Sequence, residues 1–102
     1  MEIVSPHKTP TRSEITLIIK ELVSKGALAW SKHSKERMIE RGITIPQILN
    51  CLAKGTVAEG PFLSHRSGGG YEVALEKGTA GEWLRVVVCV KFNEKLLIVT
   101  VY

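Results

Sequence analysis

The chain has few of the features by which disulfides, metals or membranes hold a protein in place. Its two cysteines, Cys51 and Cys89, have no Cys-x-x-Cys spacing, and its three histidines lie far apart. Neither a disulfide framework nor a structural zinc site is therefore expected. The longest apolar run, Val86 to Val90, is far too short to cross a bilayer. Residues 1–10 lack the apolar core of a signal peptide. We therefore expect a cytoplasmic protein with reduced thiols.

Aromatic residues are also scarce, at 6% of the 102 residues, whereas hydrophobic residues make up 44%. No segment is disordered by composition, and the length fits one domain over residues 1–102. We expect its first ten residues to form a loosely ordered arm. The formal net charge is +4, with a pI of about 9.3. This surplus favours an anionic partner such as nucleic acid or an acidic protein, without choosing between them.

The first half of the chain contains three stretches with helical periodicity. Each begins at a serine or threonine suited to capping and ends at a glycine. The helices are expected over residues 11–25, 32–41 and 44–54, with Thr11, Ser31 and Thr44 as caps and Gly26, Gly42 and Gly55 as stops.

After Gly55 the apolar period changes from about 3.6 to 2, which indicates strands. The first strand contains Gly60-Pro61 and is therefore expected at a sheet edge. The strands are expected over residues 57–64, 71–77, 83–92 and 95–102. This order predicts an α+β fold, in which two or three N-terminal helices pack on one face of a four-stranded, mostly antiparallel sheet.

The last hairpin can be divided into two faces if Asn93 and Glu94 are its loop residues. Val86, Val88 and Val90 would then face Val101, Val99 and Leu97 on an apolar side covered by the helices. The other side would carry Lys91 and would place Arg85 directly across from Tyr102. A four-residue turn at Gly78 to Gly81 would add Glu72, Ala74 and Glu76 to this outer face.

Two interpretations of this outer face remain open. It is either an ordinary solvated surface with cross-strand ion pairs or a shallow platform for anions. In the second case the adjacent loop, with His65 and Arg66, would form its rim.

The second helix is unusually basic along one side. His33, Arg37 and Arg41 recur at i, i+4 and i+8. Two arginines at i, i+4 repel each other, and together they suit a phosphate better than they suit one another. Alternatively, Arg37 pairs with Glu40 or with an acid of the sheet, and His33 simply packs near the helix start.

Residues 31–44, S-K-H-S-K-E-R-M-I-E-R-G-I-T, resemble the H-(A/S)-x-x-R-M-x-E-R-x-I motif of the "domain of unknown function" family 4258. The Lys54-Gly55-Thr56 junction and the closing I-V-T-V-Y are similar too. This resemblance covers roughly residues 30–102, leaving the first helix outside it. The Ser5-Pro6-His7 start is instead similar to MqsR-type toxins.

The resemblance implies a fold like that of the RelE, BrnT and MqsR toxins. This broad group includes metal-independent ribonucleases, each neutralised by an antitoxin. Only the helix motif carries over by position, to His33, Arg37 and Arg41. The remaining candidates, among them Arg85 and Tyr102, come from the two-face argument alone.

The chemistry implied is cleavage of RNA by the neighbouring 2′-hydroxyl, without metal or cofactor. His33 would act as base or acid, an arginine would hold the phosphate, and Tyr102 would be the partner acid. The catalytic candidates are His33, Arg37, Arg85 and Tyr102. The candidates for substrate binding are Arg41, Lys91, His65 and Arg66.

The expected partners are RNA and an antitoxin encoded by a neighbouring gene, and no membrane. Two other functions remain open. One is a non-catalytic RNA- or protein-binding module of the same fold. The other is a structural subunit that forms a homodimer through apolar residues of the outer face. The residues proposed for that interface are Val87, Cys89, Leu96 and Ile98.

Overall fold

The computed structural model describes residues 9–66, 69–79, 81–91 and 94–102. They form three helices and a five-stranded mixed sheet with strand order β1-β5-β4-β3-β2. Most of the expected N-terminal arm and part of the glycine-rich turn at 67–70 lie outside the described residues. The elements are α1 (Arg12–Ser24), β1 (Leu28–Trp30), α2 (Lys32–Arg41), α3 (Ile45–Lys54), β2 (Thr56–Leu63), β3 (Tyr71–Thr79), β4 (Glu82–Lys91) and β5 (Lys95–Val101).

The fold is α+β as predicted, but the expected count of four strands is wrong. The additional strand is β1, which pairs in parallel with β5 from Leu28–Leu96 to Trp30–Ile98. Three residues are too few to show the alternation by which a strand is recognised in sequence. The other neighbouring strands are antiparallel, and β2 is an edge strand as expected.

All three helices begin at the predicted caps. The Thr11 hydroxyl accepts a hydrogen bond from the Glu14 N–H, and the Glu14 carboxylate accepts one from the Thr11 N–H. Thr44 and Gln47 form the same reciprocal pair at α3. Gly42 ends α2 in the left-handed conformation, with φ 64°, which glycine adopts at low cost. None of the described helices is long and apolar enough to cross a membrane.

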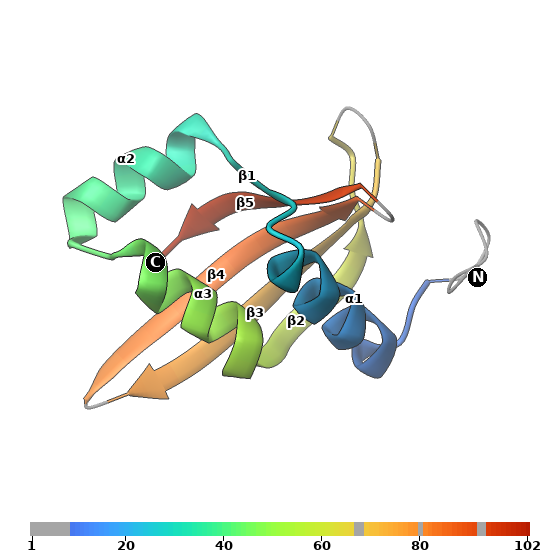
Figure 1. The fold of residues 1–102 in the computed structure, drawn as a ribbon, viewed down its shortest axis with the longest axis horizontal. Helices are drawn as coiled ribbons and strands as arrows, with labels where there is room; N and C mark the ends of the chain where they lie inside the picture. The colour runs from blue at the N-terminus through green and yellow to red at the C-terminus, as the bar shows by residue number, and fades with distance from the viewer. Residues whose placement is uncertain (1–8, 67–68, 80, 92–93) are drawn as a thin grey trace.

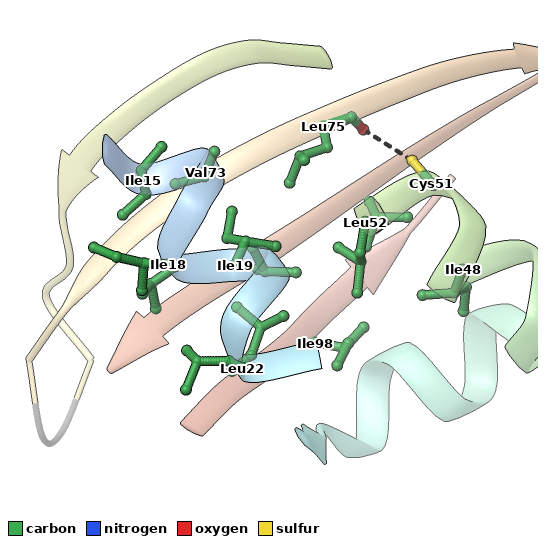
Figure 2. Close-up of a cluster of buried hydrophobic side chains, with 14 of the residues drawn as sticks. Ile15, Ile18, Ile19, Leu22, Ile48, Cys51, Leu52, Val73, Leu75 and Ile98 are labelled. Carbon is green, nitrogen blue, oxygen red and sulfur yellow. Dashed lines mark hydrogen bonds between the residues drawn. The ribbon is translucent and has the colours of Figure 1, made fainter. Parts of the chain in front are cut away.

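Helices α1 and α3 lie across one face of the sheet, whereas α2 lies beyond β5 near the C-terminus (Figure 1). The apolar stripe of α1 and one side of α3 point into the core between the layers (Figure 2). Val86, Val88 and Val90 are fully buried there, so the predicted core face of β4 is confirmed. The residues that α1 and α3 bury are Ile15, Ile18, Ile19, Leu22, Ile48, Cys51 and Leu52.

The predicted register of the β4–β5 hairpin is wrong over its first half. Val90 pairs with Leu96 and Val88 with Ile98, whereas Val86 pairs with Val101 as predicted. A register shift at this point leaves one extra residue on β5, a β-bulge at Val99. An extra residue exchanges the two faces of a strand, because side chains alternate with period two.

The bulge removes two residues from the predicted outer face. Leu96 and Ile98 are fully buried in the core, and Cys89 is buried as well. The homodimer interface proposed from these residues and Val87 is therefore wrong. After the bulge the faces return to the predicted arrangement, which keeps Tyr102 next to Arg85.

The β3–β4 turn is shorter than the predicted four residues, because the strands pair as far as Thr79 and Glu82. The register moves by two residues, which preserves the faces. Glu76 consequently lies directly opposite Arg85, and Glu72 opposite Cys89.

Candidate functional site

Helix α2 is fastened to the sheet at the bulge of β5. The Ser31 hydroxyl accepts a hydrogen bond from the Ser34 N–H (3.0 Å) and donates one to the Val99 carbonyl (2.7 Å). The Ser31 N–H also donates to the Ile98 carbonyl, at 3.0 Å. The sequence had suggested helices behind the sheet. These bonds instead bring the basic helix to its edge, alongside the last residues of β5.

At this edge Arg37 meets Tyr102. The Arg37 guanidinium carbon lies 5.7 Å from the centre of the Tyr102 ring, within the range of a cation–π contact. The Tyr102 N–H donates to the Arg85 carbonyl at 2.9 Å, so these two residues are neighbours across β4 and β5 as predicted. Tyr102 remains 44% exposed and thus open to a ligand.

Arg85 itself is occupied by two carboxylates of the outer face. Its guanidinium donates to Glu76 of β3 and to Glu59 of β2, the latter at 2.8 Å. Hydrogen bonds to these two acids raise the pKa of Arg85. The charge of Arg85 is therefore locally neutralised. For this residue, the interpretation of the outer face as a surface with cross-strand ion pairs holds. Glu59 was not expected here because the pairing of β2 was not predictable from its sequence.

His33 lies one helical turn before Arg37, a rise of about 6 Å along α2. Its side chain is exposed and makes no hydrogen bond to another described residue. It therefore shares the same side of α2 as the Arg37–Tyr102 contact without touching it.

Arg41, a further turn along, lines a cavity of about 360 Å³ together with Tyr102. The cavity lies where the end of α2, one side of α3 and the far end of the β3–β4 hairpin come together. Its lining residues are Arg41, Gly42, Ile43, Gln47, Asn50, Cys51, Lys77, Glu82, Trp83, Leu84 and Tyr102.

The other predicted substrate-binding residues lie at the opposite end of the sheet. Lys91 is six residues from Arg85 along β4, which corresponds to about 20 Å. Arg66 pairs with Glu72 at 2.9 Å, and the Ser64 hydroxyl donates to the same carboxylate. His65 is exposed beside them. The candidates thus form two groups, and only the group around Tyr102 combines a phenol, cations and a cavity.

A family model described as "Domain of unknown function (DUF4258)" matches residues 30–102, which is well over half of the chain. The chain belongs to this family. Comparisons with curated proteins and with solved structures found no match. The DUF4258 segment includes α2, α3 and strands β2 to β5, and therefore both the Arg37–Tyr102 contact and the cavity. Helix α1 precedes it.

Several cavity residues of the DUF4258 segment were not identified from sequence. Gln47, Asn50 and Lys77 lie on different elements, and no spacing along the chain links them. Cys51 also reaches the cavity, but burial raises the pKa of its thiol to about 11, with a smaller raising effect of Glu76 opposed by Lys77. It is therefore a protonated thiol at neutral pH. Among the described residues, no group of three His, Cys, Asp or Glu side chains is placed to hold a metal ion.

Proposed function

We propose that the chain is a metal-independent endoribonuclease toxin of a type II toxin–antitoxin pair, with a RelE-like fold. The observation that carries this proposal is the contact between Arg37 and Tyr102, with Arg41 lining the adjoining cavity. It joins a motif residue of α2 to the phenol of Tyr102, which directly follows β5. Cleavage by the neighbouring 2′-hydroxyl requires cations at the phosphate and groups that move protons. Arg37 and Arg41 supply the cations, Tyr102 supplies one proton-transferring group, and His33 on the same helix is the candidate for the other.

In this mechanism the RNA 2′-oxygen attacks the adjacent phosphorus while His33 takes its proton. The bond from phosphorus to the 5′-oxygen breaks, and Tyr102 donates a proton to the leaving oxygen. The products are a 2′,3′-cyclic phosphate and a 5′-hydroxyl. Arg37 and Arg41 stabilise the charge of the phosphorane, since arginine forks match phosphate oxygens.

Arg85 has a different role in this proposal from the one first assigned to it. Its guanidinium is already bonded to Glu59 and Glu76, so phosphate binding falls to Arg37 and Arg41. Arg85 supports the site through its backbone, because its carbonyl accepts the Tyr102 N–H. It is thus a positioning residue for the end of β5.

The second candidate function is a non-catalytic RNA- or protein-binding module of the same fold. Two observations favour it. The imidazole of His33 is exposed and lies a full turn from Arg37, and the two glutamates beside Arg85 repel phosphate. Such a module would bind RNA through α2 and leave it intact.

The deciding experiment is expression of the chain in a bacterial host without an antitoxin, followed by RNA cleavage by the purified protein in EDTA. A toxin should stop growth and produce fragments that end in a 2′,3′-cyclic phosphate. Tyr102→Phe retains the ring over Arg37 but removes the proton donor, so the cleavage rate should fall by about 100-fold or more. Arg37→Gln should have a similar effect.

Lys20→Gln is the matched control, because Lys20 is an exposed cation on α1 away from the site. It should leave both growth arrest and cleavage unchanged. RNA that is bound in a gel but never cut would support the binding module. Cleavage that persists in Tyr102→Phe would contradict the assignment of Tyr102.

A further inference from the structure

One end of β4 has no strand beside it among the described residues. Strand β5 reaches along β4 only as far as Arg85, whose carbonyl accepts the N–H of Tyr102. The β3–β4 hairpin continues beyond this point (Figure 1), and β4 stays paired with β3 as far as Glu82. Residues Glu82–Leu84 therefore have β3 on one side and the cavity next to Tyr102 on the other.

The backbone of Trp83 points into this open side. In an antiparallel sheet the N–H and C=O of one residue point to the same neighbouring strand, and the direction alternates along the chain. Arg85 points its carbonyl to Tyr102, so Trp83, two residues earlier, points both of its groups to the same side. Neither group is hydrogen-bonded to another described residue. The end of β4 thus offers a donor and an acceptor at the spacing of a strand.

We propose that an extended acidic segment of a partner protein adds to β4 here, in line with β5, and occupies the cavity of about 360 Å³. A peptide backbone carries donors and acceptors at the spacing that Trp83 offers, whereas a nucleic-acid backbone does not. The unpaired stretch of β4 is about 10 Å long, so about three residues of the partner would pair there. This inference goes beyond the proposed function, because it concerns a protein partner and holds whether or not RNA is cut.

The charges around the cavity favour an acidic segment. Side chains of an added strand alternate between the two faces of the sheet. A side chain opposite Leu84 points, like Leu84, to the face covered by the helices, where Arg41 and Lys77 line the cavity. Of the described lining residues, these two are cations and Glu82 is an acid. An acid opposite Leu84 and an apolar residue opposite the exposed Trp83 therefore suit the two faces.

The edge of the sheet at β2 is closed by a side chain instead. The guanidinium of Arg12 donates to the carbonyls of Gly60 (3.1 Å), Val57 (3.2 Å) and Ala58 (3.5 Å). A side chain that occupies the carbonyls of an edge strand hinders another strand from adding there. The chain thus covers much of β2 and leaves the end of β4 open, which favours the latter as the place for a partner strand.

The test uses the full chain and the peptide Ac-Val-Glu-Val-Thr-Val-NH2. Two further peptides carry lysine in place of the glutamate or proline in place of the central valine. Binding is followed by NMR as the exchange of the Trp83 backbone N–H with solvent. We expect the acidic peptide to slow this exchange several-fold and to bind more tightly than the lysine peptide. The proline peptide lacks an N–H and pairs poorly as a strand, so it should not slow the exchange.

Lys77→Gln removes one cation of the cavity and should weaken binding of the acidic peptide by about three-fold. It should leave the rate of RNA cleavage unchanged, since Lys77 has no part in the proposed mechanism. Lys20→Gln is the matched control, because Lys20 is an exposed cation on α1 away from the cavity. This control should leave peptide binding unchanged.

Three results would overturn the proposal. One is equal binding of the acidic and lysine peptides, and another is a Trp83 N–H whose exchange the acidic peptide does not slow at any concentration. The third is protection of this N–H by something else. Protection that rises with protein concentration in the absence of peptide would place a second copy of the chain there, and protection by an RNA oligonucleotide instead of the peptide would place RNA there.

The peptide titration does not depend on cleavage, so the two proposals can fail separately. A chain that binds the acidic peptide at Trp83 but never cuts RNA would keep the partner strand and refute the nuclease. A chain that cuts RNA but whose Trp83 N–H the peptide leaves unprotected would do the reverse. Where both proposals hold, the peptide should compete with RNA, because Tyr102 lines the same cavity.

Discussion

Arg85 and Tyr102 have neighbouring backbones, but their side chains have different partners. The phenol of Tyr102 lies under Arg37 of α2, whereas the guanidinium of Arg85 is shared between Glu76 and Glu59. The outer face thus has an arginine on β4 that is paired with two acids. Beside it lies a phenol covered by Arg37, which forms no ion pair with a described acid. Which cation is available to a phosphate is decided by these individual contacts.

Glu59→Gln tests whether the acids of the outer face limit RNA binding. The Glu59 side chain is 60% exposed, and its removal leaves Arg85 with one carboxylate. We expect RNA affinity to rise a few-fold, and the dependence of affinity on salt to become steeper. Filter binding over a range of salt concentrations measures both.

Glu21→Gln is the control for this change, because Glu21 is an exposed acid paired with Lys25 on α1. It alters the net charge by the same amount away from the outer face. An equal rise in affinity for both variants would mean that only net charge matters.

Cys51 makes stability depend on pH in the alkaline range. Burial raises the pKa of its thiol from 9.0 to about 11. Between these values the unfolded chain releases a proton that the folded chain retains, so the free energy of unfolding falls as pH rises. From pH 8 to pH 10.5 this single group should remove about 2 kcal/mol.

Denaturant unfolding of the protein and of Cys51→Ala measures this effect as the difference between their pH profiles. Other groups titrate in the same range, but they contribute equally to both proteins. The variant should be less stable at pH 8 because a buried side chain is lost. Its stability should also fall less steeply with pH, and parallel profiles would contradict the raised pKa.

Among the three helices of the described residues, α2 buries the fewest hydrophobic side chains. The buried residue of α2 is the polar Ser34. Its Met38 is partly buried and packs against the core. Polar bonds from Ser31 to β5 supply much of its fixation. The position of the helix, and with it Arg37 and Arg41, therefore depends on a single cap.

Ser31→Ala removes the hydroxyl that both caps α2 and donates to Val99. We expect a loss of about 1–2 kcal/mol in the free energy of unfolding. RNA cleavage should fall as well, because Arg37 loses its fixed place over Tyr102. Thermal unfolding and the cleavage assay, run on the same samples below the melting temperature, measure the two effects.

Thr11→Ala is the matched control, since Thr11 caps α1 in the same way. It should cost about 1 kcal/mol of stability and leave the cleavage rate unchanged. If Ser31→Ala cleaves RNA at the normal rate, the bonds that Ser31 forms with β5 are not needed to hold α2 in place for cleavage.

Across the whole molecule, basic side chains are distributed at both ends of the sheet. Arg37 and Arg41 lie with Tyr102 and the cavity, whereas Lys91 lies about 20 Å from Arg85 along β4 and Arg66 pairs with Glu72 at that other end of the sheet. The net charge of +4 is therefore spread over a surface longer than one phosphate site. An RNA strand could contact both ends while only one of them performs chemistry.

Arg66→Gln should accordingly weaken RNA binding modestly, by about two-fold, and lower the salt dependence, without changing the cleavage rate at saturating RNA. Arg41→Gln should reduce both affinity and the saturated rate. Single-turnover cleavage at several RNA concentrations distinguishes the two. A lower saturated rate in Arg66→Gln would place the far end within the catalytic site.

The helices and the strands of the second half could be predicted because their signals are local. A cap, an apolar stripe or an alternating run depends on residues within about one or two turns of each other. Thr11, Ser31, Thr44 and the valines of β4 carried these signals. The resemblance of residues 31–44 to the family motif likewise made His33, Arg37 and Arg41 candidates, because the motif is a local pattern of residue types and spacings.

What tertiary structure decided was which of these residues meet. The bulge at Val99, the short strand β1 and the placement of α2 at the sheet edge arise from pairing between segments distant in the chain. The same is true of the Glu59–Arg85 bond and of the cavity, which is lined by residues of α2, α3, β3 and β4 and by Tyr102. Such contacts depend on register and packing, which a period in sequence does not encode.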